Sequence, residues 1–299
     1  MSITEKLKDI MMVSGPEYET GNRKAQVIAV CAQKGGVGKT TSTINLGTSL
    51  AYFHRRKVLV IDLDPQGHVE KSLGSIVTDG IEYTSLSQVL ESKKGNVMDA
   101  VVKTELEGFD ITPGDRALVQ SESVLGSRIG KEFILSTALK TAKTHYDFIL
   151  FDCSPSLGNL TLNALVAADH VLVPCEMSVL AFEGVSDLLE TLREVTERLN
   201  QNLKVLGVLF TRVDGRNVTM NNLITENMKR FFSGKIFKTL ITINTAINKA
   251  QLEGRPVFDY SPSCSGSLNY QALAAEVMSR LKSHLVAIDG DVGRRSRVG

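Results

Sequence analysis

Residues 31–42 read Cys-Ala-Gln-Lys-Gly-Gly-Val-Gly-Lys-Thr-Thr-Ser, and this stretch decides the fold. In the phosphate-binding loop G-x-x-x-x-G-K-[ST], backbone N–H groups cradle phosphate oxygens, the lysine reaches the β- and γ-phosphates, and the hydroxyl binds Mg²⁺. Gly38, Lys39 and Thr40 fill the last three positions, whereas Gln33 stands where the first glycine is expected. A second lysine, Lys34, lies five residues before Lys39. The loop is therefore a variant, KGGVGKT, and its additional lysine indicates a nucleotide-operated dimer rather than a generic nucleotide binder.

The flanking residues supply the strand and the helix that such a loop requires. Residues 26–31, Gln-Val-Ile-Ala-Val-Cys, form a short apolar, β-branched run typical of a buried strand. Between residues 40 and 53, apolar side chains from Ile44 to Phe53 recur at roughly helical spacing. The N-terminus of that helix would add its partial positive charge to the phosphate site.

Two further apolar runs end in carboxylates. Residues 57–67 read Lys-Val-Leu-Val-Ile-Asp-Leu-Asp-Pro-Gln-Gly and supply Asp62 and Asp64, and residues 146–152, Tyr-Asp-Phe-Ile-Leu-Phe-Asp, supply Asp152. Acids at the carboxyl ends of parallel strands face the ligand crevice, where they can orient an attacking water or hold the water shell of Mg²⁺. Asp152 fits the Walker B position, whose carboxylate binds Mg²⁺ through water.

These motifs together resemble the ParA group of the ParA/MinD ATPases, which carry a deviant Walker A loop. The resemblance rests on KGGVGKTT, DLDPQG, YDFILFDCSPSLG, LTLNAL at 160–165, VLVPCEMSVLAFEG at 171–184 and GRPVFDYSPSCSGSLNY, in that order. It covers roughly residues 25–282. It implies an α/β P-loop NTPase fold, a doubly wound, mainly parallel sheet flanked by helices.

The resemblance also implies an ATPase that dimerises face to face around two ATP molecules, with ATP and Mg²⁺ as cofactors. Lys34 matches the signature lysine that crosses to the partner's ATP, Lys39 the phosphate lysine and Asp64 the acid linked to hydrolysis; these three are the predicted catalytic residues. The predicted metal ligands are Thr40, Asp62 and Asp152. The predicted nucleotide-binding residues are Lys34, Gly35, Gly36, Val37, Gly38, Lys39, Thr40, Thr41, Thr211, Asp214, Thr242 and Asn244.

Length and composition agree with one large α/β domain. The chain has 299 residues, 42% of them hydrophobic, and buried strands are expected at 27–31, 57–61, 147–151, 169–174, 203–210 and 236–241 with helices between most of them. No run of 18 apolar residues and no secretory pattern occurs, so we expect a cytoplasmic protein. The four cysteines are scattered without a C-x-x-C pair, and we interpret them as small buried residues rather than ligands.

The domain prediction has three parts. Residues 1–24 are expected to be a flexible N-terminal extension, in which residues 4–12 could form amphipathic turns carrying Leu7, Ile10 and Met11. Residues 25–286 form a single ParA-like ATPase domain. Residues 287–299 form a basic, disordered tail.

Charge points to a polyanion as a partner. Residues 201–299 hold 14 Lys and Arg against 7 Asp and Glu, although the whole chain carries only +1. ParA proteins that bind DNA commonly carry arginines in a segment I-P-R-N-V-R, and the matching residues 241–247, Ile-Thr-Ile-Asn-Thr-Ala-Ile, contain no basic residue. We therefore predict salt-sensitive, sequence-independent DNA binding through a reduced or shifted patch, with Arg216 first, Lys249 next and Lys238 after them.

The leading hypothesis is a nucleoid-associated positioning or segregation ATPase whose homodimer forms with ATP. Its cargo would be a chromosome or plasmid origin bound through a ParB-like partner, or a protein cluster bound through an adaptor that stimulates hydrolysis; the sequence does not separate these. One alternative is a membrane-associated, MinD-like spatial regulator, which would need a C-terminal amphipathic helix, whereas residues 268–286 match a closing core helix. A metabolic enzyme or kinase on the same fold is the other alternative.

Overall fold

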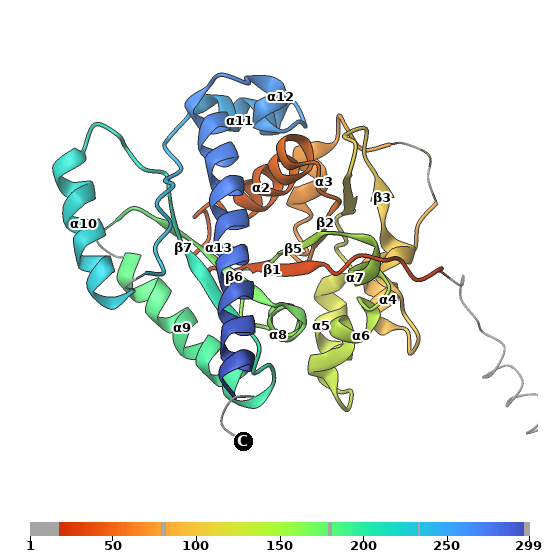
Figure 1. The fold of residues 1–299 in the computed structure, drawn as a ribbon. Helices are drawn as coiled ribbons and strands as arrows, with labels where there is room; N and C mark the ends of the chain where they lie inside the picture. Colours follow the sequence, from red (N-terminus) through yellow and green to blue (C-terminus); the bar gives the residue numbers. More distant parts are fainter. Residues whose placement is uncertain (1–17, 79, 81, 179–180, 233, 296–299) are drawn as a thin grey trace, which may run out of the picture.

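A seven-stranded sheet in the order β3-β4-β2-β5-β1-β6-β7 forms the centre of the molecule. The computed structural model describes residues 18–78, 80, 82–178, 181–232 and 234–295. The strands are β1 (Gln26–Val30), β2 (Val58–Asp62), β3 (Val102–Lys103), β4 (Phe109–Thr112), β5 (Phe148–Asp152), β6 (His170–Glu176) and β7 (Lys204–Thr211). All neighbouring strands are parallel except β3, which runs antiparallel to β4 at the edge (Figure 1). This confirms the predicted fold class.

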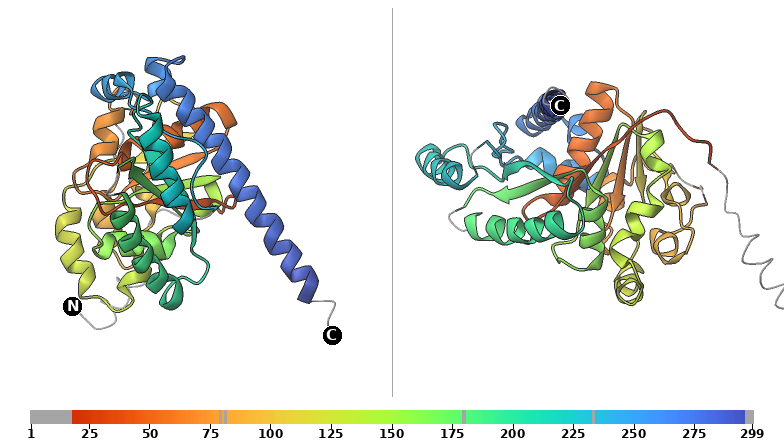
Figure 2. Two further views of the ribbon diagram at one scale, coloured as in Figure 1. Left: turned by 90° about the vertical axis from the view of Figure 1, so that its left-hand side faces the viewer. Right: turned by 60° about the horizontal axis from the view of Figure 1, so that its bottom comes forward.

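Helices cover both faces of the sheet, because alternate strand residues point to opposite sides. In β1, Val27 and Ala29 belong to one hydrophobic core, and Ile28 and Val30 belong to the other. The first core is closed by α4 (Leu86–Glu91), α5 (Leu118–Gly126), α6 (Ile134–Ala138), α8 (Asn159–Ala167) and α9 (Ala181–Arg198). The second is closed by α2 (Lys39–His54), α3 (His68–Leu73), α11 (Thr245–Leu252), α12 (Val257–Tyr260) and α13 (Ser265–Arg295). Figure 2 shows the two helical layers on either side of the sheet.

Further elements complete the fold. They are η1 (Val97–Ala100), η2 (Lys131–Phe133), α7 (Ala142–His145) and α10 (Val218–Phe231). Among the described residues, no helix is long and apolar enough to cross a bilayer.

The expected strand at 236–241 is wrong. Residues 236 and 242 make isolated bridges, to Val208 and Val213, and Phe237 and Ile241 donate backbone hydrogen bonds to β7, but this segment forms no continuous strand. Its apolar character has another cause, since Phe237 and Ile241 are buried in the second core. The sequence prediction also misses β3 and β4. These strands are short, and β4 carries the buried polar residues Asp110 and Thr112, which mask its hydrophobic pattern.

Part of the expected N-terminal extension is bound to the domain. Tyr18 donates a hydrogen bond from its hydroxyl to Asp99, and the Gly21 amide donates to Thr144 Oγ1. Arg23 pairs with Asp147 at 2.5 Å. The described residues 18–24 are therefore not a free linker, and the turns expected at 4–12 lie outside the described residues.

The C-terminal tail differs from the sequence prediction. Helix α13 continues to Arg295, so residues 287–295 are helical rather than disordered, and residues 296–299 lie outside the description. Gly290 and Gly293 suggest a break, since glycine costs a helix about 1 kcal/mol relative to alanine. Elongation of a helix already nucleated on a packed core avoids the costly first turn. Figure 2 shows the end of α13 projecting beyond the domain.

Candidate nucleotide-binding site

The phosphate-binding loop connects β1 to α2 at the carboxyl edge of the sheet. Gly36 and Gly38 have φ angles of 75° and 85°, in the left-handed region that side chains other than glycine rarely adopt. Gly38 precedes the first residue of α2, so the loop leads directly into a helix N-terminus. The rest of the segment that the sequence predicts to hold phosphates consists of Lys34, Gly35, Val37, Thr40 and Thr41. The local geometry is that of an anion cradle.

Asp152 lies against the first turn of α2. Val30 is the register partner of Asp152 in the β1–β5 pairing, which brings the end of β5 beside the start of the loop. Thr40 donates from Oγ1 to Asp152 Oδ2 at 2.7 Å, and Thr43 Oγ1 lies 3.3 Å from Oδ1. Burial raises the pKa of Asp152 to about 7, against the opposing effects of these hydroxyls and of Lys39. The structure thus joins two of the three predicted metal ligands directly.

Asp62 and Asp64 occupy the end of β2 and the turn after it. Asp62 is the register partner of Asp152 and is fully buried. Its carboxylate accepts the backbone N–H groups of Asp64, at 3.0 Å, and Val69, at 3.1 Å. Burial, with the nearby Asp152 charge, raises the pKa of Asp62 well above its usual range. In this arrangement Asp62 holds the loop that presents Asp64, whose side chain accepts the Gln66 amide.

Lys39 is buried at the centre of this group, with 8% of its surface exposed. Its ammonium donates to the carbonyl of Lys34 at 3.3 Å. Burial lowers the pKa of Lys39, whereas the charges of Asp152 and Asp64 oppose that change. The predicted phosphate lysine and the predicted acids therefore lie together.

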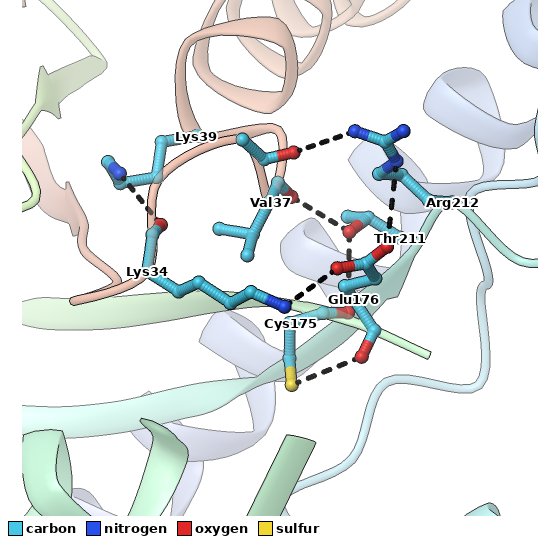
Figure 3. A network of polar contacts seen from close by, with 8 residues as sticks. Lys34, Val37, Lys39, Cys175, Glu176, Thr211 and Arg212 are labelled. Atoms are coloured by element: carbon cyan, nitrogen blue, oxygen red, sulfur yellow. Dashed lines mark hydrogen bonds and ion pairs between the residues drawn. The ribbon is translucent and has the colours of Figure 1, made fainter. Parts of the chain in front are cut away.

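Lys34 extends away from the Lys39 ammonium (Figure 3). Its Nζ donates to Glu176 at 3.0 Å, and its side chain is 58% exposed. Glu176 also lies 3.8 Å from Arg212, whose guanidinium donates to the carbonyl of Gly36. Sequence reasoning misses both Glu176 and Arg212. The available signal was that each stands at the carboxyl end of an apolar strand, the same position that identifies Asp62 and Asp152.

A cavity of about 210 Å³ opens beside the loop, and several of the predicted nucleotide-binding residues line it. It is lined by Gly36, Gly38, Thr41, Thr211, Arg212, Ile241, Thr242, Ile243, Asn244, Ile247, Asn248 and Tyr270. Thr211 donates from its hydroxyl to the carbonyl of Val37 at 2.8 Å, which ties β7 to the loop. Asn244 caps α11 and donates to Ser265, so its amide is already engaged.

Asp214 does not line this cavity. Its carboxylate is bound by Arg216 through Nε at 2.9 Å and a terminal nitrogen at 2.7 Å. These hydrogen bonds lower the pKa of Asp214 to about 2. Its predicted contact with the nucleotide stays a prediction without support from the cavity.

The residues present fit ATP and Mg²⁺. A glycine loop, a buried lysine and a helix N-terminus suit the phosphates, and a hydroxyl with buried carboxylates supplies the hard oxygen ligands that Mg²⁺ requires. Buried carboxylates with raised pKa values indicate charge sites that a cation would stabilise.

The three predicted DNA-binding residues lie on separate elements. Arg216 follows β7, Lys238 precedes α11, and Lys249 lies within α11. All three are exposed. Arg216 is 89% exposed but paired with Asp214. The structure therefore presents these exposed cations on three different stretches of the chain.

Comparison with known proteins agrees with this geometry. Residues 25–205 match a family model described as an AAA domain. The chain is 39% identical over 252 residues to the sporulation initiation inhibitor protein Soj of Bacillus subtilis, covering 84% of this chain and 98% of Soj. It is 40% identical over 257 residues to the chromosome partitioning protein ParA of Caulobacter vibrioides, covering 85% of this chain and 94% of that protein.

The chain belongs to the ParA/MinD family of P-loop ATPases. A solved structure of cobyrinic acid a,c-diamide synthase from Mycobacterium smegmatis, with a bound ATP analog and magnesium, is also similar. It has a TM-score of 0.72 and 32% sequence identity, and the match covers 87% of this chain and 97% of that one. The two chains therefore share a fold over most of their length.

Proposed function

We propose that the chain is an ATP-dependent dimerising ATPase that binds DNA without sequence specificity and positions or segregates a cargo. The observation that carries this proposal is the divergence of the two loop lysines. Lys39 is buried among the acids, whereas Lys34 lies outside them and is exposed. A cation placed in this way is suited to the phosphates of a second protomer.

Hydrolysis would use residues that the sheet already holds in place. Asp64 is 8% exposed and fixed by the loop that Asp62 binds, so it can orient an attacking water. Lys39 would bind the phosphates from its own protomer, and Lys34 would neutralise charge on them from the partner. Mg²⁺, held near Thr40, Asp152 and Asp62, would neutralise part of the phosphate charge. Hydrolysis should be slow until a partner protein completes the alignment.

DNA binding is supported by the basic C-terminal third and by the relatives. Arg216, Lys238 and Lys249 offer exposed cations, and phosphate contacts need no base-specific geometry. ParA of Caulobacter vibrioides is named for chromosome partitioning, which motivates a DNA origin with a ParB-like partner as the cargo. A protein cluster with its own adaptor is the other cargo class. Either would place the protein in the cytoplasm, on the nucleoid.

A MinD-like membrane role is less well supported. The larger apolar side chains of α13 that are buried in the second core are not available to a bilayer; they are Tyr270, Leu273, Val277 and Leu281.

The test is ATP-dependent binding to non-specific duplex DNA at two salt concentrations, with wild type, Asp64→Ala and Arg216→Ala compared. We expect binding that requires ATP, persists in Asp64→Ala because the dimer is trapped, and weakens with salt. Lys24→Ala is the matched control, since Lys24 is exposed at the opposite end of β1. Absence of binding by the trapped dimer would contradict the DNA proposal and direct the search to a membrane or protein scaffold.

A further inference from the structure

Glu176, the last residue of β6, contacts two cations from distant parts of the chain. Its Oε2 accepts a hydrogen bond from Lys34 Nζ at 3.0 Å, and its Oε1 lies 3.8 Å from Arg212 Nε. Arg212 also donates to the Gly36 carbonyl at 3.2 Å. One carboxylate therefore links the phosphate-binding loop to the end of β7 (Figure 3). We name Lys34, Glu176 and Arg212 the Glu176 cluster.

The backbone at Arg212 is held in an uncommon conformation. Its φ is 52°, and among the described residues only Arg55 is another non-glycine residue with positive φ. Both neighbours are fixed, because Thr211 donates to the loop at Val37 and the Val213 amide donates to Ile241. Such conformations persist where the surroundings hold them, and they concentrate at functional sites. Here the consequence is a guanidinium directed at the loop and at Glu176.

We propose that Glu176 is a shared counter-ion that holds Lys34 against its own protomer, and that Arg212 keeps Glu176 paired when Lys34 moves to a partner's nucleotide. This inference rests on the proposed function, in which Lys34 acts across a dimer interface. In the proposed dimer, Lys34 Nζ leaves Glu176 of its own protomer to reach the partner's phosphates. Dimerisation then breaks the 3.0 Å contact, and Glu176 and Arg212 set the cost of breaking it. Both are positioning residues, since they act through Lys34.

Arg212 lowers that cost in two ways. It already shares the carboxylate, so departure of Lys34 does not leave Glu176 without a cation. It also weakens the ion pair between Glu176 and Lys34 before dimerisation, because two cations compete for one carboxylate. The side chains are 58%, 34% and 60% exposed for Lys34, Glu176 and Arg212, so solvent screens these pairs. We therefore expect changes of about twofold to fivefold in the rate of Lys34 labelling and in the dimer Kd, and these changes should decrease as the salt concentration rises.

The first experiment tests the cluster in the nucleotide-free protein. Acetylation of Lys34 by an N-hydroxysuccinimide ester is followed by mass spectrometry. Glu176→Gln should accelerate it by about twofold to fivefold, and Arg212→Gln should slow it, because Glu176 then binds Lys34 alone. The matched control is Glu226→Gln, which breaks the 2.8 Å pair of Glu226 with Lys229 on α10 and should leave Lys34 labelling unchanged. Equal Lys34 labelling in wild type and Glu176→Gln would overturn the proposal.

The second experiment measures the ATP-dependent dimer by sedimentation in an Asp64→Ala background. Glu176→Gln should lower the dimer Kd by about twofold to fivefold, and Arg212→Gln should raise it. In the Glu176→Gln background, Arg212→Gln should have a smaller effect, because only its hydrogen bond to the Gly36 carbonyl then remains to be lost. A weaker dimer in Glu176→Gln, or an Arg212 effect of full size in that background, would overturn the inference. If Asp64→Ala alone fails to dimerise with ATP, the proposed function fails, and the labelling result still decides whether the cluster exists.

Discussion

The carboxyl edge of the sheet, where the phosphate-binding loop lies and which we call the nucleotide edge, differs from the basic C-terminal third, residues 201–299, in the burial of its charged side chains. At the nucleotide edge, Lys39, Asp62 and Asp152 are buried and engaged by neighbouring strands and the first turn of α2. In the C-terminal third, Arg216 and Lys249 are exposed on a loop and a helix. Sheet pairing places Asp62 beside Asp152, and Lys39 is close enough to lower the pKa of the Asp152 carboxyl, whereas Arg216 and Lys249 lie on separate stretches of the chain. Short motifs therefore predict a site well when a sheet aligns their ends, whereas a surplus of surface charge does not by itself define one.

The largest expected effect distinguishes the two lysines within the nucleotide edge itself. Lys34→Ala should reduce dimer-dependent hydrolysis by about 10³-fold, the lower range for a cation supplied across an interface. ATP affinity of the monomer should change by less than about threefold, because Lys34 pairs with Glu176 outside the group around Lys39. The measurement is the hydrolysis rate against protein concentration, with Lys24→Ala as control. A normal rate in Lys34→Ala would remove the argument for a cation acting in the partner.

Lys39→Met should give the next largest effect, and it should act on ATP affinity rather than on dimer-dependent hydrolysis alone. It removes the buried ammonium while keeping most of the side-chain volume, and we expect ATP affinity to fall by about 100-fold, as for loss of a buried charge partner. Fluorescent nucleotide titration measures this loss, and a melting curve verifies that the variant is folded. If Lys39→Met bound ATP as tightly as wild type does, Lys39 would not be the lysine that binds the phosphates within its own protomer.

Much of this edge is predictable from sequence for a physical reason. Val30, Asp62 and Asp152 each end an apolar run, and parallel pairing necessarily brings such ends together. The role of Asp62 in binding the loop at Asp64 and Val69 is not predictable, because it depends on how the turn closes in space. Glu176 and Arg212 were missed because the partner of a charged residue at the end of an apolar strand is known only once the strand lies beside the loop, where these two contact Lys34 and Gly36. In the C-terminal third, buried Phe237 suggested a strand that the sheet does not contain.

The buried Asp152 predicts pH dependence at the nucleotide edge. Burial raises the pKa of its carboxyl to about 7, so the protein without ligand is largely protonated there below that pH. Mg²⁺ requires the ionised form, and the affinity for Mg²⁺ with ATP should therefore increase by about tenfold between about pH 6 and pH 8. Isothermal titration in buffers of different ionisation enthalpy would detect the released proton. Asp152→Asn should reduce this dependence, leaving the contribution of Asp62, and a flat wild-type profile would contradict the assignment.

The same pKa shift has a consequence for stability with the opposite sign. Between the ordinary carboxyl pKa and about 7, the folded protein holds more protons at Asp152 than the unfolded chain does. The free energy of unfolding of the nucleotide-free protein should therefore decrease as pH rises through this window. Urea unfolding across the window measures this, and Asp152→Asn should show a smaller decrease.

The smallest expected effects lie in the C-terminal third, where Arg216 and Lys249 can be compared directly. Lys249→Ala should weaken DNA binding by about twofold to fivefold and reduce the salt slope by about 0.9, the value for one phosphate contact. Arg216 is already bound by Asp214, so Asp214→Asn should strengthen DNA binding by releasing the guanidinium. Nucleotide affinity should not change in Asp214→Asn, because Asp214 lies outside the cavity beside the loop. Weaker DNA binding in Asp214→Asn would mean that the pair positions Arg216 rather than competing for it, and the C-terminal third would then hold its charges as the nucleotide edge does.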